Sequence, residues 1–252
     1  MSAIFPQPIP HPPPFLSLVP KTSTGRLDLL QARALDYFVR DCLALNVSDA
    51  RQLKKAFGWD EQLSLGLCIR SAPTEVYRLI GCAAVRAEMC DLDAWPAGFY
   101  VDDANILRFH LEKRYGLVVP VVRRWVRGLQ YYRHAKDEQP RWITSASRPT
   151  GSPALASIHV ADATSGARKP DEETKAFLVD HTLKAMAVTA LHNLTAVAFN
   201  GVSLRTLTAQ LFDSLPCLRG VVVAMKEPPA MLEKALCDDG LSVTFWKGGE
   251  LL

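Results

Sequence analysis

The clearest structural signal in the chain is Leu218-Arg219-Gly220-Val221-Val222-Val223-Ala224-Met225. Its three consecutive valines form a continuous apolar run, which is typical of a strand that is covered on both faces. Shorter strands and helices alternate around this run, and we expect them at 156–161, 171–191, 194–199, 203–215, 228–239 and 241–246. Alternation of this kind predicts a small three-layer α/β domain with a mostly parallel sheet.

The half of the chain that precedes this domain has a different periodicity. Residues 24–136 carry apolar side chains at three- and four-residue spacing, which predicts a helical domain. Its last two helices are expected at 104–115 and 120–133. Residues 137–153 have the proline, serine and glycine content of a linker. The expected fold class is therefore α plus α/β, with the α/β domain at 154–252.

The N-terminal segment is dominated by proline. Seven of the 17 prolines lie within the first 20 residues, and such a segment favours extended polyproline geometry. It is either a solvated tail or an arm, because Phe5 and Phe15 are too apolar for a segment that only meets water. An arm would lie along a partner subunit or along the chain's own core. We expect protein partners to bind through this arm, residues 1–23.

Composition excludes several classes of protein. The 252 residues are 48% hydrophobic and 22% charged, which indicates a globular chain. No run of about 18 residues is apolar and uncharged, and the N-terminus lacks the charge and apolar core of a secretory signal. The six cysteines stand singly in apolar stretches, without Cys-x-x-Cys spacing. We therefore expect a cytoplasmic protein with buried, reduced thiols and no membrane partner.

The formal net charge of +3 is unevenly distributed. Between Arg108 and Arg148 ten basic residues stand against three acidic ones, a net charge of +7, so the rest of the chain sums to −4. A local basic field attracts phosphate backbones whatever the global charge. This stretch predicts a nucleic-acid partner, with DNA favoured over RNA. A basic surface that contacts protein and a merely solvated face remain the alternatives.

One segment of the basic stretch resembles a known DNA-binding unit. The segment Tyr115-Gly116-Leu117-Val118-Val119-Pro120-Val121-Val122-Arg123-Arg124-Trp125-Val126-Arg127 resembles the turn and recognition helix of a helix-turn-helix unit spanning 104–128. The resemblance implies that its basic side chains reach phosphates or guanine edges. It departs from the family where valines replace the polar residues at the start of the recognition helix. The candidate nucleic-acid-binding residues are Arg108, Lys113, Arg114, Arg123, Arg124, Arg127 and Arg133.

The C-terminal segment carries a second resemblance. Residues 194–252 are similar to the last part of restriction-endonuclease-like folds of the Mrr type, which end in a glycine-led valine strand, a proline-started helix and Gly-x-Glu-Leu. That family needs an acidic residue on one strand and an acid-or-glutamine-x-lysine pair on the next to hold magnesium. The strand expected to carry the pair, 196–200, has neither acid nor lysine. The resemblance therefore implies a catalytically silent domain.

Other catalytic motifs are missing from the sequence. The six histidines form no His-x-x-x-His pair, and neither glycine-rich nucleotide motif occurs. We expect no catalytic residue, no metal and no cofactor. Asp162, at the end of the first predicted strand, is the best-placed carboxylate, because the carboxyl ends of strands host sites in α/β sheets. The residues after it, Ser165 to Lys169, could bind an anion.

These observations favour a protein that is not an enzyme and that binds nucleic acid, as a regulator or as a subunit of a bacterial nucleoprotein complex. One alternative is a structural subunit of secretion or defence machinery, which would use the basic helix and the proline-rich arm for protein contacts. A second alternative is a metal-dependent nuclease that uses Asp162.

Overall fold

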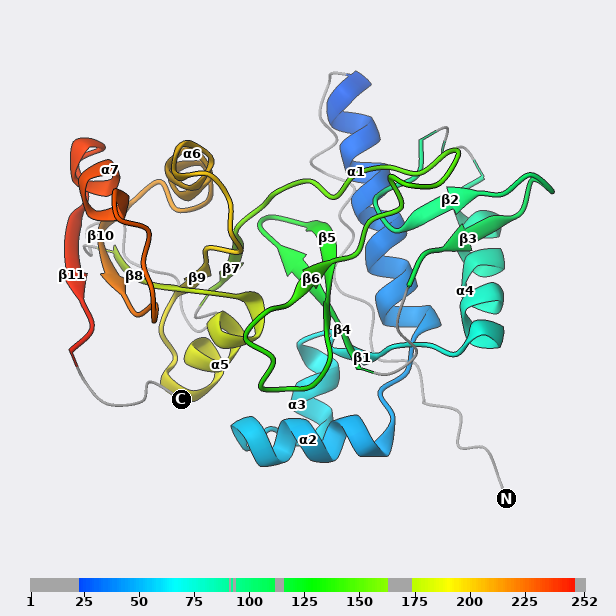
Figure 1. The fold of residues 1–252 in the computed structure, drawn as a ribbon, viewed down its shortest axis with the longest axis horizontal. Helices are drawn as coiled ribbons and strands as arrows, with labels where there is room; N and C mark the ends of the chain where they lie inside the picture. Colours follow the sequence, from blue (N-terminus) through cyan, green and yellow to red (C-terminus); the bar gives the residue numbers. More distant parts are fainter. Residues whose placement is uncertain (1–22, 91, 93, 112–115, 163–173, 248–252) are drawn as a thin grey trace.

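The computed structural model describes residues 23–90, 92, 94–111, 116–162 and 174–247. Within these residues helices combine with three sheets of four, five and two strands (Figure 1). Helices and strands are both present, which agrees with the general α+β class, but the range 24–136, which was expected to be helical, also contains strands. No helix in these ranges is long and apolar enough to cross a membrane. The arm expected at residues 1–23 lies almost wholly outside the described residues.

Four helices and one π-helical turn occupy the N-terminal part of the described chain. They are α1 (Ser23–Tyr37), η2 (Phe38–Cys42), α2 (Val47–Phe57), α3 (Glu61–Gly66) and α4 (Glu75–Glu88). The start of α2 is fixed by Asn46, whose Oδ1 accepts a hydrogen bond from the Asp49 N–H at 2.8 Å. The helix ends at Gly58, whose φ of 72° lies in the left-handed region that glycine adopts without strain.

The same part of the chain also contains an antiparallel sheet. Its order is β1-β4-β5-β6, formed by β1 (Arg70–Ser71), β4 (Leu117–Val122), β5 (Val126–Tyr132) and β6 (Arg141–Trp142). A separate hairpin pairs β2 (Phe99–Val101) with β3 (Leu107–Phe109). Phe99 and Phe109 pack with Phe38 of η2 in the core beneath these strands.

The helices predicted at 104–115 and 120–133 are wrong. The described residues of these segments include β3 and most of the β4–β5 hairpin, which pairs from Leu117↔Tyr132 to Val122↔Val126. The physical reason lies in the valines of β4, because β-branched side chains favour the extended backbone when they pack on both sides. Five of the six β4 residues are buried. Because strands take the place of these helices, the resemblance to a helix-turn-helix unit is wrong as well.

The C-terminal part is built on a five-stranded sheet. Its order is β11-β10-β8-β9-β7, formed by β7 (His159–Ala161), β8 (Thr174–Val179), β9 (Ala196–Ala198), β10 (Leu218–Val223) and β11 (Ser242–Phe245). Neighbouring strands are parallel except β7, which runs antiparallel to β9. The helix predicted at 171–191 is wrong in its first half, because residues 174–179 form the central strand β8. Its second half is α5 (Thr182–His192).

Helices cover both faces of this sheet. Side chains alternate along each strand, so Leu178 and Val197 face one side while Val179 and Ala198 face the other. On the first side lie α6 (Leu204–Ser214) and α7 (Leu232–Asp238), which contribute leucines to a shared core. On the second side lies α5, as Figure 1 shows.

The antiparallel sheet packs directly on α5. Leu117, Val119 and Tyr132 form one buried cluster with Leu183 and Met186 of the helix. In Figure 1, α5 lies between the five-stranded sheet and the strands β4–β6. The two sheets therefore share a core through this helix. The domain limits placed at 137–153 stay a prediction, and that segment contains β6.

Not all thiols follow the expectation of burial. Cys68 and Cys82 are buried, whereas Cys90, Cys217 and Cys237 are exposed. Burial raises the pKa of the Cys82 thiol to about 12. The prediction fails for the exposed three because each lies near the end of a helix or strand, where one apolar neighbour in sequence does not imply a covered position.

Candidate functional site

The strand order points to one edge of the five-stranded sheet. From β8 the chain runs through α5 to β9 on one side, and from β10 it runs through α7 to β11 on the other side. Ligands of open α/β sheets bind outside the carboxyl ends of the strands, where such connections diverge. The residues that follow Val179 and Val223 are therefore the place to look for a site.

A pocket of about 460 Å³ lies at this edge. It is bounded by the ends of β8 and β10, by the start of α5, by the end of α2 and by the loop between β5 and β6. We call it the switch-point pocket. Its charged lining consists of three lysines and three carboxylates, Lys136, Glu138, Asp180, Lys184, Lys226 and Glu227.

Two ion pairs organise these charges. Nζ of Lys184, in the first turn of α5, lies 3.0 Å from Oδ2 of Asp180, the residue that follows β8. These side chains are 25% and 30% exposed, so water screens the pair less than it screens a surface pair. Nζ of Lys226 lies 3.7 Å from Oε2 of Glu138, with both side chains about three quarters exposed. The second pair is weak and brings the β5–β6 loop toward the end of β10.

A buried tyrosine supports the wall of the pocket from the other sheet. Tyr132 is fully buried, and its hydroxyl donates to Oε1 of Gln130 at 3.0 Å and accepts the Leu183 N–H at 3.3 Å. Burial raises its pKa far above the ordinary value, so the hydroxyl keeps its proton. The bond to Leu183 satisfies one of the N–H groups that the first turn of α5 leaves without a helical partner.

His181 lies between Asp180 and the first turn of α5. Its ring meets that of Tyr132 edge to face, with centroids 5.7 Å apart. Burial lowers the pKa of His181 to about 4, so the imidazole is neutral near pH 7. Its Nδ1 is buried and makes no hydrogen bond to any residue that the structure describes. His181 therefore contributes shape rather than charge to the pocket.

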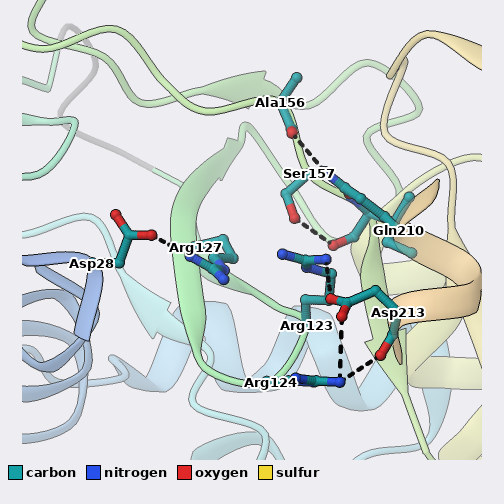
Figure 2. A network of polar contacts seen from close by, with 9 residues as sticks. Asp28, Arg123, Arg124, Arg127, Ala156, Ser157, Gln210 and Asp213 are labelled. Carbon is teal, nitrogen blue, oxygen red and sulfur yellow. Dashed lines mark hydrogen bonds and ion pairs between the residues drawn. The ribbon is translucent and has the colours of Figure 1, made fainter. Parts of the chain in front are cut away.

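Most of the sequence-predicted arginines lie elsewhere and have partners within the chain. In the turn between β4 and β5, Nη1 of Arg123 lies 2.6 Å from Oδ2 of Asp213, and Arg124 donates to the Asp213 carbonyl oxygen at 2.6 Å (Figure 2). Nη1 of Arg127 lies 3.8 Å from Oδ2 of Asp28 in α1. These arginines tie the hairpin to α6 and α1.

The other four candidates have different surroundings. Arg108 pairs with Asp102 at 2.7 Å, and Arg133 pairs with Asp137 at 3.4 Å. Lys113 and Arg114 lie outside the described residues. Of all seven, only Arg133 belongs to the β5–β6 loop that borders the switch-point pocket, and it is not among the residues that line the pocket. Binding of nucleic acid by these side chains stays a prediction.

Asp162 does not belong to this edge of the sheet. Because β7 is antiparallel to β9, with Ala161 opposite Ala196, the carboxyl end of β7 lies at the amino ends of the parallel strands. Oδ1 of Asp162 accepts a hydrogen bond from the Thr195 hydroxyl at 2.9 Å. The anion site expected at Ser165–Lys169 lies outside the described residues.

The sequence prediction missed the main residues of the pocket. Asp180 and Lys184 were placed inside a helix predicted from 171, so the strand end before them was overlooked. The signal was present, because the apolar run Ala176-Phe177-Leu178-Val179 ends at an acidic residue. Lys226 and Glu227 likewise follow the valine strand that the sequence did identify.

Comparison with known proteins reveals similarity in structure. No protein-family model matches the chain, and the curated proteins contain no match. The Aquifex aeolicus primase, solved with its zinc-binding and RNA polymerase domains, is similar with a TM-score of 0.55 and 19% identity, over 89% of this chain. The RNA polymerase domain of Mycobacterium tuberculosis primase DnaG has a TM-score of 0.50 and 15% identity, over 90% of this chain and 77% of its own.

These similarities establish the fold and correct the earlier expectations. The chain spans 55% of the Aquifex aeolicus structure that it matches. A fold shared with primase RNA polymerase domains overturns both the helix-turn-helix and the Mrr-type resemblance. It also contradicts the prediction of a non-catalytic regulator, and it gives no support to a structural subunit or to an Asp162 nuclease.

Proposed function

We propose that this chain is a primase-like enzyme module that acts on nucleic acid, and that its switch-point pocket receives phosphate groups of a strand or a nucleotide. The observation that carries the proposal is the position of the pocket, which lies at the carboxyl ends of β8 and β10 and is lined by three lysines. The proteins of similar fold are named as primases with RNA polymerase domains.

The lysines suit phosphate because of their chemistry. An ammonium group has three N–H donors and binds phosphate as a point charge. Lys184 and Lys226 can each keep their carboxylate partner and still direct another N–H into the pocket. The first turn of α5 adds the partial positive charge of a helix N-terminus on the same side.

Polymerases commonly use two metal ions held between carboxylates. The residues of this pocket do not fit such a centre: across the described ranges, no group of three or more His, Cys, Asp and Glu side chains could hold a metal ion. Asp180 and Glu138 face lysines instead. We therefore derive no reaction step through a metal and assign to the chain's own residues the binding and orientation of phosphate.

Binding of a labelled single-stranded oligonucleotide by the full chain, measured by fluorescence anisotropy over a range of salt concentrations, tests this proposal. A double variant Lys184→Ala/Lys226→Ala is expected to bind more weakly and to lose about 0.7 of the logarithmic salt slope per phosphate contact removed. Lys175→Ala is the matched control, because Lys175 is exposed and lies at the opposite end of β8.

Primer synthesis from ribonucleotides on the same template, with magnesium or manganese in the buffer, tests the enzymatic part of the proposal. Template-dependent product that the double variant loses and the control keeps would support it. The proposal is wrong if the chain neither binds the strand at low salt nor makes product, or if the double variant behaves as the unaltered chain does.

A further inference from the structure

We infer that the switch-point pocket binds phosphate through lysine ammonium groups without a divalent cation. The inference rests on the proposed function and specifies how that site recognises its ligand. The ligand chemistry is a phosphate ester or anhydride, which a nucleoside polyphosphate and a strand backbone share. In this pocket lysine side chains supply the positive charge that a bound divalent cation would otherwise supply to the phosphate.

The first support is the Asp180–Lys184 pair. Asp180 follows the central strand, where a carboxylate is best placed to hold a cation, but Nζ of Lys184 already lies 3.0 Å from its Oδ2. The two residues are one helical turn apart in sequence, so the backbone of the β8–α5 connection holds them together. A cation at Asp180 would have to displace the ammonium group of a lysine whose side chain is three quarters buried.

The second support comes from the opposite wall. Glu138, from the β5–β6 loop, has Lys226 at 3.7 Å, and Lys226 follows β10. Each of the two strand ends at the divergence point therefore has its own lysine close by. Glu227 is the remaining carboxylate of the pocket lining, and one carboxylate does not make a metal site.

The third support is the charge of the pocket as a whole. Three lysines balance three carboxylates, and His181 is neutral at physiological pH because burial lowers its pKa to about 4. Lys184 compensates Asp180 closely and Lys226 compensates Glu138 weakly, so an incoming phosphate meets the remaining N–H groups of these two lysines and the ammonium group of Lys136. A cation would have to displace an ammonium group from Asp180 or from Glu138 before it could use either carboxylate.

Isothermal titration calorimetry with inorganic tripolyphosphate and with a single-stranded oligonucleotide tests the inference. Each titration is run on the full chain, once in EDTA and once in magnesium. Binding in EDTA at least as tight as in magnesium is expected. The charge-removing variant Lys184→Met/Lys226→Met is expected to lose about tenfold in affinity or more. Lys184→Arg/Lys226→Arg, which keeps the charge, and the control Lys175→Met are expected to stay within about twofold.

The two probes separate the sources of the phosphate. Tripolyphosphate binding in EDTA assigns the pocket to a nucleotide, and oligonucleotide binding alone assigns it to a strand; both outcomes support the inference. Binding of either probe only in magnesium overturns the inference and leaves the proposed function intact. An absence of binding under every condition overturns the proposed function as well. Circular dichroism of each variant, together with the arginine variant, distinguishes loss of binding from loss of folding.

Discussion

Nζ of Lys184 lies 3.0 Å from Oδ2 of Asp180, so the first turn of α5 is joined by charge to the end of the central strand. The contact lies where the connections between the strands of the sheet diverge. Asp180 is the best-placed candidate for a metal ligand at this edge, and it is paired with the ammonium group of Lys184 instead. The fold shared with primase RNA polymerase domains therefore carries a pocket in which two lysines already pair with two of the carboxylates.

The hydroxyl of Tyr132 joins the two sheets through α5, and its removal should weaken the protein. Tyr132→Phe leaves the Leu183 N–H and the Gln130 amide without this partner in a buried position. We expect a loss of about 1–3 kcal/mol in the free energy of unfolding, measured by urea denaturation. Tyr77→Phe, at a tyrosine that is 63% exposed, should change it little. Equal stability of the two variants would contradict a structural role for this hydroxyl.

Asp213 holds two arginines of the β4–β5 turn, and its carboxylate should matter for stability. Asp213→Ala removes the partner of Arg123, whose side chain is only 16% exposed. Because the Asp213 side chain is itself 46% exposed, water compensates in part, and we expect a loss of about 1–2 kcal/mol. Asp239→Ala, at an exposed position after α7, is the control. If Arg123 and Arg124 served chiefly to bind nucleic acid, Asp213→Ala would instead bind a nucleic-acid strand more tightly, with an unchanged free energy of unfolding.

Two buried histidines should make the fold sensitive to acid. Burial lowers the pKa of His159 to about 3, and its Nδ1 accepts the Val122 N–H at 3.0 Å. The unfolded chain takes up this proton below about pH 6.5, whereas the folded chain does so only near pH 3. Stability should therefore fall as the pH drops from 6.5 toward 3, by up to about 1.4 kcal/mol per pH unit for each such histidine.

Urea denaturation at several pH values checks this expectation. His159→Gln should remove the contribution of one histidine to the pH dependence of the free energy of unfolding. His181, whose pKa is lowered to about 4, should account for a second contribution. His134→Gln, at an exposed position, should leave the curve unchanged. A curve that is flat between pH 6.5 and pH 4 in the unaltered chain would show that these imidazoles are not buried in their neutral form.

The sequence was sufficient for the parts of the fold with strong local signals. The valine run marks β10, and Ser203 begins α6, where its Oγ accepts the Thr206 N–H. It was insufficient where local signals compete. The acidic residues at 171–173 are typical of a helix start and concealed β8, and three- and four-residue apolar spacing concealed the β4–β5 hairpin. The carboxylate partner of Arg123 lies 90 residues later in the chain and that of Arg127 lies 99 residues earlier, so only the fold brings them together.

The sequence did not predict the switch-point pocket for the same reason. With β8 predicted as helix, Asp180 had no strand end to follow, and Asp162 appeared to be the best-placed carboxylate. The antiparallel direction of β7 puts Asp162 at the other edge of the sheet. The partition of charge into +7 and −4 correctly identified a basic stretch, but most of its described arginines are bound within the chain.

The affinity of Asp180→Asn for a single-stranded oligonucleotide in EDTA tests the central claim most directly. This substitution removes a negative charge and releases Lys184, so phosphate bound by lysine should bind several-fold more tightly than in the unaltered chain. Asp60→Asn, at the exposed start of α3, would control for the change in net charge. A loss of binding in Asp180→Asn, with the control unaffected, would show that the carboxylate itself holds the ligand, and would contradict the account.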